Sequence, residues 1–149
     1  MSWIAISRKI VLFLFIFCSL VSCIIIDLVD SSHELKYSRL IGVKITTLSN
    51  LWALGITNDQ NYQGDADYIL LTESNVTGPE IVTKNFVKKG LNLRVRKVLT
   101  TRLMFIHRVY FVVEEIGSNI LSSNSIRIML AGSVENQNFG LDDKLYTKQ

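Results

Sequence analysis

The chain has 149 residues, with 16 basic and 13 acidic side chains and a formal net charge of +3. This length is that of a single domain, which excludes a multidomain organisation. Two of the basic residues, Arg8 and Lys9, adjoin a long apolar run, and the rest of the chain carries 14 basic and 13 acidic side chains. A domain so close to neutrality is a poor nucleic-acid-binding candidate, so no nucleic-acid partner is expected.

The N-terminal run, residues 10–26, contains seventeen uncharged residues (IVLFLFIFCSLVSCIII) and ends at Asp27. A basic segment, an apolar segment and then small residues are typical of a secretory signal. Residues 20–23 read LVSC, which resembles the lipobox of bacterial lipoproteins. The resemblance implies that residues 1–22 are a signal segment cleaved before Cys23, and that a diacylglycerol is attached to the Cys23 sulfur.

The same resemblance implies a location in the cell envelope. Ile24 stands where aspartate is the usual signal for retention in the inner membrane, so the lipid anchor is expected in the outer membrane, facing the periplasm. Two alternatives remain open: residues 10–26 as an uncleaved signal anchor, giving a single-pass inner-membrane protein with a periplasmic domain, or plain cleavage. Seventeen apolar residues lie at the short end of the ~17–25 that span a bilayer. All three alternatives place the domain outside the cytoplasm.

The first half of the remaining chain predicts mostly strands. Residues 23–36 are expected to form a polar tether. Apolar and polar residues then alternate in two segments, 40–48 and 52–57, which indicates β-strands. Residues 58–67 have the composition of a loop, 67–73 of a short strand, and Gly78-Pro79 of a turn. Residues 80–90 fit a short helix or an extended strand equally well.

The second half shows the clearest alternation. Leu91, Leu93 and Val95 alternate with polar residues, a turn follows at 100–102, and residues 103–115 predict one long strand. Residues 125–130 predict a last strand, and the tail 139–149 is expected at the surface. The predicted fold class is all-β with at most one short helix: a small closed or partly open β-barrel of SH3 or OB type, or a small sandwich, in a domain spanning 37–149.

One further resemblance concerns the middle of the chain. Residues 70–95 contain Gly78-Pro79, then Lys88-Lys89-Gly90, then alternating apolar residues. This stretch resembles bacterial SH3-type domains, in which a Gly-Pro turn and a Lys-Lys-Gly turn lead into a strand. The tryptophan-glycine elements usual near the end of those domains are missing after Val95. The resemblance covers about a fifth of the chain and implies an SH3-like barrel.

The candidate ligand-binding residues are four arginines on the predicted hairpin: Arg94, Arg96, Arg102 and Arg108. Such a patch suits anionic headgroups, the carboxylates of peptidoglycan stems or an acidic partner protein. The alternative is the ordinary solvated face of an antiparallel pair, where alternation predicts charges in any case.

Catalytic and metal signatures are weak. Asp65 and Asp67 form a carboxylate pair of the kind a hydrolase uses. Residues 59–67 have oxygen side chains at alternate positions, as calcium loops have, but position twelve is Leu70 rather than glutamate. No nucleophile elbow, phosphate loop or zinc signature occurs. We therefore expect no enzyme activity, no metal and no cofactor.

Together these patterns predict a membrane-tethered accessory or binding lipoprotein of the bacterial cell envelope, which engages a partner protein or cell-wall polymer without catalysis. One alternative is an inhibitor or immunity-type protein that acts on an enzyme through the loop 58–67. Another is an envelope hydrolase that uses Asp65 and Asp67.

Overall fold

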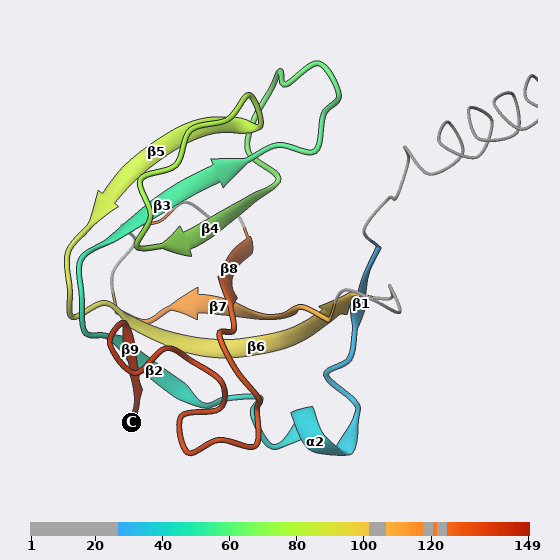
Figure 1. The fold of residues 1–149 in the computed structure, drawn as a ribbon, viewed down its shortest axis with the longest axis vertical. Coiled ribbons are helices and arrows are strands. Elements are labelled where there is room, and N and C mark those ends of the chain that lie inside the picture. Colours follow the sequence, from blue (N-terminus) through green and yellow to red (C-terminus); the bar gives the residue numbers. More distant parts are fainter. Residues whose placement is uncertain (1–26, 102–106, 118–120, 122–124) are drawn as a thin grey trace, which may run out of the picture.

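A computed structural model describes residues 27–101, 107–117, 121 and 125–149 of the chain (Figure 1). The predicted signal segment, including Cys23, and the candidate Arg102 lie outside the described residues. The elements are, in chain order, β1 (Leu28–Asp30), α2 (Leu35–Ser38), β2 (Lys44–Thr47), β3 (Leu51–Ile56), β4 (Tyr68–Thr72), β5 (Ile81–Val87), β6 (Asn92–Thr101), β7 (Val109–Glu115), β8 (Ser125–Met129) and β9 (Tyr146–Lys148).

The strands form one sheet of mixed direction, which confirms the predicted all-β class with one short helix. Its order is β5-β3-β4-β8-β7-β6-β2-β9, and β1 pairs with β6 beside this path. Strands β4 and β8 are parallel, whereas the other pairs are antiparallel. The sheet curls but stays open, with β5 and β9 at the two ends of the path (Figure 1). Within the described ranges, no helix is long and apolar enough to span a membrane.

The core lies on the concave side of this sheet and follows from period-two alternation. Its members are buried aliphatic and aromatic side chains from every long strand, among them Ile69, Leu71, Leu93, Phe111, Val113, Ile126 and Ile128. In β6 the alternation changes phase, because a bulge between Val95 and Lys97 inserts an extra residue. Val98 therefore joins Val95 in the core, and Lys97 stays outside.

Two strand predictions need revision. Residues 80–90, which fit a helix or a strand, contain strand β5, because β3 is available as a partner along its full length. The single long strand predicted over 103–115 is shorter in the described part, where β7 begins at Val109 and His107 and Arg108 precede it without strand structure.

The segments expected at the periphery pack against the sheet. Within the predicted tether, β1 pairs with the end of β6, and the buried Ser31 hydroxyl lies 2.8 Å from the Thr100 hydroxyl. The prediction that the tail 139–149 lies at the surface is wrong for two side chains. Leu141 and Tyr146 are buried in the core, because β9 extends the sheet beside β2.

The connection from β4 to β5 covers part of the convex side of the sheet. Strand β3 lies between these two strands, so residues 73–80 must cross it. Lys84 is paired with Leu54 in the ladder, and its amine donates a hydrogen bond of 2.9 Å to the Val76 carbonyl. This bond places the connection on the convex side and explains why Leu54, which does not face the core, is fully buried.

We predict that Tyr146→Phe leaves the protein as stable at neutral pH or stabilises it by up to about 1 kcal/mol. The Tyr146 hydroxyl is buried and has no hydrogen-bond partner among the described residues, so removing it breaks no hydrogen bond. Unfolding in urea at pH 7 measures the difference. Tyr146→Ala, which also removes the buried ring, is expected to cost about 3–5 kcal/mol.

The same variant is expected to change the alkaline limit of stability. Burial, with Asp142 and Glu73 adding to it, raises the pKa of Tyr146 above its usual value of 10.0. A folded-state pKa above the unfolded one gives a stabilisation that is complete below about pH 10 and is lost as the pH rises. The wild type should therefore lose stability between pH 10 and 12 more steeply than Tyr146→Phe, and parallel curves would contradict this.

Candidate functional site

Two of the predicted arginines are held by one carboxylate. The Arg94 Nη1 lies 3.4 Å from Glu114 Oε1, and the Arg96 Nε lies 3.1 Å from Glu114 Oε2. Ordinary alternation about the buried Val95 places both arginines on the convex side, and Arg94 is directly opposite Glu114 in the ladder. All three side chains remain partly exposed, so these ion pairs orient the arginines more than they stabilise the fold.

Arg108 lies apart from these two. Its backbone N–H donates to the Thr101 hydroxyl at 3.0 Å, at the opposite end of β6 from Arg94. At ~3.3 Å per residue the two positions are separated by about 20 Å. The structure therefore brings Arg94 and Arg96 together but does not bring Arg108 to them.

A better-defined cationic feature lies at the connection between β5 and β6, which we call the lysine turn (Lys88, Lys89 and Gly90). Gly90 has a φ of +93°, a conformation that glycine adopts without strain. The turn is fastened to the β2–β3 connection: the Lys89 N–H donates to Asn50 Oδ1 at 3.0 Å, and the Gly90 N–H donates to the Thr47 carbonyl at 2.8 Å. A turn fixed in this way holds its lysines at a defined place on the molecule.

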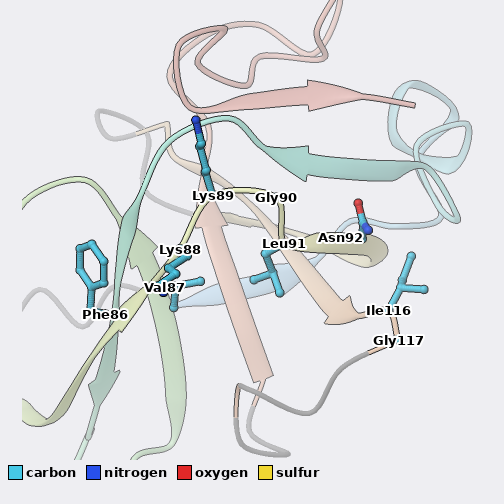
Figure 2. Close-up of a pocket in the computed structure, with 9 residues that line it drawn as sticks. All are labelled: Phe86, Val87, Lys88, Lys89, Gly90, Leu91, Asn92, Ile116 and Gly117. Atoms are coloured by element: carbon cyan, nitrogen blue, oxygen red, sulfur yellow. The ribbon is translucent and has the colours of Figure 1, made fainter.

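The lysine turn borders a cavity of about 580 Å³ between the end of β5 and the end of β7 (Figure 2). Leu91 and Ile116 form apolar sides of the hollow, whereas Lys89 extends from its rim (Figure 2). The described lining contains no acidic side chain: it comprises Phe86, Val87, Lys88, Lys89, Gly90, Leu91, Asn92, Ile116 and Gly117. Within the described ranges, neither lysine is paired with a carboxylate within 4.0 Å.

Aromatic side chains continue from this cavity onto the convex side of β5 and β3. Phe86 is 54% exposed, although a large apolar side chain is usually buried. Its ring contacts Trp52 edge-on with centroids 5.4 Å apart, and the Lys84 amine lies 5.4 Å from the Trp52 ring. Lys84, Phe86, Lys88 and Lys89 thus form a strip in which apolar and cationic groups alternate, which suits a partner with both apolar and anionic groups.

A second cation–aromatic pair lies farther along the convex side. The Arg127 guanidinium is 3.8 Å from the Tyr68 ring centroid, and the Arg127 Nε is buried without a hydrogen-bond partner in the described part. Burial raises the pKa of the Tyr68 hydroxyl, and the Arg127 charge partly opposes that rise. The stacking accounts for the position of Arg127.

The two aspartates considered for hydrolysis lie at the surface. Asp67 Oδ2 accepts the Asn58 N–H at 2.6 Å, and so closes the loop 58–67. Asp65 and Asp67 are both exposed. In the described ranges no three potential metal-ligating side chains gather.

Sequence reasoning found the charges of the lysine turn but missed the cavity. Lys88 and Lys89 enter the sequence-based prediction only as part of the Lys-Lys-Gly turn of the SH3-type resemblance, and Phe86 does not enter it. A signal was present, because every second residue of the stretch 84–89, Lys84, Phe86 and Lys88, is cationic or aromatic and shares one side of an extended strand. Its significance depends on which strand lies at the edge of the sheet, and topology alone decides that.

Comparison with protein-family models, with curated proteins and with solved structures finds no match. The resemblances of residues 20–23 to a lipobox and of residues 70–95 to SH3-type domains stay predictions. The geometry and charge of the described residues are therefore the basis for assigning a function.

We predict that Glu114→Gln lowers the free energy of unfolding by less than about 1 kcal/mol, because the ion pairs it breaks are partly exposed. Urea unfolding checks this value. A loss above 2 kcal/mol would show that Glu114 holds the hairpin together rather than merely orienting Arg94 and Arg96.

Proposed function

We propose that this chain is a non-catalytic binding protein of the bacterial cell envelope, tethered to the membrane, which holds an anionic partner at the lysine turn. The observation that carries this proposal is the cavity of about 580 Å³ with two lysines and no acidic side chain in its described lining. A volume of this size is in the range of small-ligand sites, and can receive a side chain or chain end of a larger partner.

The lining favours binding over catalysis. Lysine amines supply positive charge, Asn92 supplies an amide, and Leu91 and Ile116 supply apolar contact. A carboxylate or phosphate at the rim is attracted by the amines, while an apolar group beside it can contact Leu91 and Ile116. The described part of the lining contains no histidine, serine, cysteine or acidic residue that could act as nucleophile or general base.

The envelope location depends on the N-terminal sequence. The segment 1–22 with Cys23 supports an outer-membrane lipid anchor facing the periplasm, and residues 10–26 as a signal anchor support the inner membrane instead. Either arrangement leaves the lysine turn outside the cytoplasm, where acidic envelope proteins and the carboxylates of peptidoglycan are both accessible.

A second candidate function, inhibition of an enzyme by the loop 58–67, is favoured by the order of that loop. The Asp59 carboxylate accepts the N–H groups of Asn61 and Gln63 at 3.3 and 3.0 Å. The loop projects beyond β3 and β4 (Figure 1) and presents Tyr62, which is 49% exposed. A pre-organised loop with an exposed aromatic residue is a suitable shape for entering a cleft. Replacing residues 60–65 with Gly-Ser repeats would abolish inhibition and leave binding at the lysine turn intact.

We predict that Lys88→Glu/Lys89→Glu weakens the binding of poly-L-glutamate at least tenfold, because the cavity loses both of its amines. The measurement is fluorescence anisotropy with the full chain in detergent micelles at about 50 mM salt. Wild-type affinity should also fall as salt rises, as screening requires.

The matched control is Lys144→Glu/Lys148→Glu, which changes the net charge equally on an exposed part of the tail. It should retain affinity within threefold. Equal losses of affinity in the two double variants would overturn the proposal, because they would show that binding depends only on the net charge of the protein. Co-sedimentation with purified peptidoglycan sacculi tests in parallel whether a wall polymer occupies the same site.

The tether is tested by the intact mass of the protein purified from bacterial membranes. We expect a mass of residues 23–149 plus acyl groups, and loss of both cleavage and acylation in Cys23→Ser. A wild-type mass that retains residues 1–22 would contradict the lipid anchor and support the signal anchor.

A further inference from the structure

Strand β5 is an uncovered edge of the sheet. It pairs with β3 on one side, and no other described strand pairs with it. Figure 1 shows β5 as the outermost strand at its end of the sheet. At seven residues it is more than twice as long as β9, the three-residue strand at the other end of the path.

The hydrogen bonds just beyond the two ends of β5 show which of its backbone N–H and C=O groups point toward β3 and which point away from the sheet. The Thr57 N–H donates to the Glu80 carbonyl at 2.9 Å, so the alternate residues of β3 that face β5 are Leu51, Ala53 and Gly55. Their ladder partners, Thr83, Asn85 and Val87, use their backbone groups toward β3. The Lys89 N–H, which also points to that side, follows the same alternation. Val82 is the extra residue of the bulge between Ile81 and Thr83, so the alternation is regular only after it. The N–H and C=O groups of Lys84 and Phe86 therefore face away from the sheet.

The usual protections of such an edge are missing from β5. Natural sheets blunt their edges with proline, bulges, inward charges or covering segments. The strand contains no proline, and its one bulge, at Val82, leaves the residues from Thr83 to Val87 in regular pairing. Its one lysine, Lys84, is bent over the convex side, where it bonds the Val76 carbonyl. An unprotected edge of this length is a template for another strand.

The charges beside this edge select what it pairs with. Lys84, Lys88 and Lys89 lie along the second half of the strand and the turn after it, and none has a carboxylate within 4.0 Å among the described residues. In-register parallel pairing with β5 of a second copy would place each lysine beside its own copy, and antiparallel pairing centred on Phe86 would place Lys84 opposite Lys88. Like charges opposite one another destabilise a ladder. A strand with acidic residues at these positions meets opposite charge, and one with an apolar residue beside Phe86 covers its exposed ring.

We propose that β5 binds an extended, acidic segment of a partner protein, which adds to the sheet as a further strand and directs a carboxylate to the lysine turn. This inference depends on the proposed function, since it names the class of the anionic partner. Backbone hydrogen bonds to Lys84 and Phe86 supply affinity, and the lysines with Phe86 supply selectivity for alternating acidic and apolar side chains.

The test uses the full chain in detergent micelles and a labelled twelve-residue peptide in which glutamate and valine alternate. The control probes are two N-methylated versions of the same peptide, one methylated at the odd-numbered residues and the other at the even-numbered residues. Both keep the side chains, and each removes one of the two sets of backbone donors. We expect the N-methylated analogues to bind at least tenfold more weakly in one register. Equal binding of all three peptides would overturn strand addition.

The protein variants are Phe86→Pro and Phe86→Ala, which both remove the exposed ring. Proline also removes the outward-facing N–H of Phe86, and an edge strand tolerates proline at such a position, whereas alanine keeps that donor. Phe86→Pro should bind the peptide at least tenfold more weakly than Phe86→Ala, with unfolding midpoints measured for both. If Phe86→Pro unfolds, the N-methylated peptides decide the matter alone.

The remaining outcomes separate this inference from the proposed function. Poly-L-glutamate binding that needs Lys88 and Lys89, combined with no effect of N-methylation and equal binding by Phe86→Pro and Phe86→Ala, leaves the proposed function standing and removes strand addition. Binding of sacculi but not of the peptide would assign the site to a wall polymer and overturn the inference. Dimerisation that is abolished by Phe86→Pro but not by Phe86→Ala would assign the edge to a second copy and overturn it equally.

Discussion

The fold depends on one long, bent strand. Strand β6 pairs with β7 along one side, while its other side pairs with β2 at the start and β1 at the end. Between them, the Gly42 N–H donates to the Val95 carbonyl and the Val98 N–H donates to the Ser32 hydroxyl, so the bulged middle of β6 is also bonded. The bulge bends the strand and curls the sheet around its core. Every other element is placed relative to this strand.

This constraint also explains why the sheet has an exposed edge. The side of β6 that faces away from β7 is paired with β1, with β2 and with the residues between them. Beyond β2 the sheet is extended only by the three residues of β9. Strand β5 is joined to β6 by the lysine turn, yet it belongs to the opposite end of the path. The turn is fastened to the β2–β3 connection through Asn50 and Thr47, so the curled sheet is stabilised there without the two ends forming a ladder. A ladder across this gap would satisfy the outward groups of β5 and remove the cavity.

Much of the fold could be predicted from the sequence, because alternation reports which side of a strand faces the core. The segments 52–57, 67–73 and 125–130 became β3, β4 and β8 within one or two residues. Prediction failed where the pairing strand, rather than the local residue pattern, decides whether a segment becomes a strand. Residues 28–30 and Tyr146 lie in polar or terminal segments whose local sequence predicts no strand. They form strands because the backbone groups of β6 and β2 are available to pair with them. The site was only half predictable for the same reason: the lysines are visible in the sequence, whereas the edge and the cavity exist only once the strand order is known.

The two cationic regions differ in what remains available for a partner. Arg94 and Arg96 share Glu114, so an incoming anion must compete with a carboxylate that is already in place. Lys88 and Lys89 have no such competitor among the described residues, and the turn that carries them is held by backbone hydrogen bonds rather than by its side chains. The two amines can therefore turn toward a partner without disrupting the hydrogen bonds that hold the turn. A binding site needs a rigid frame with unsatisfied groups attached to it, and the lysine turn at the end of an open strand meets both conditions, whereas the arginine pair meets only the first.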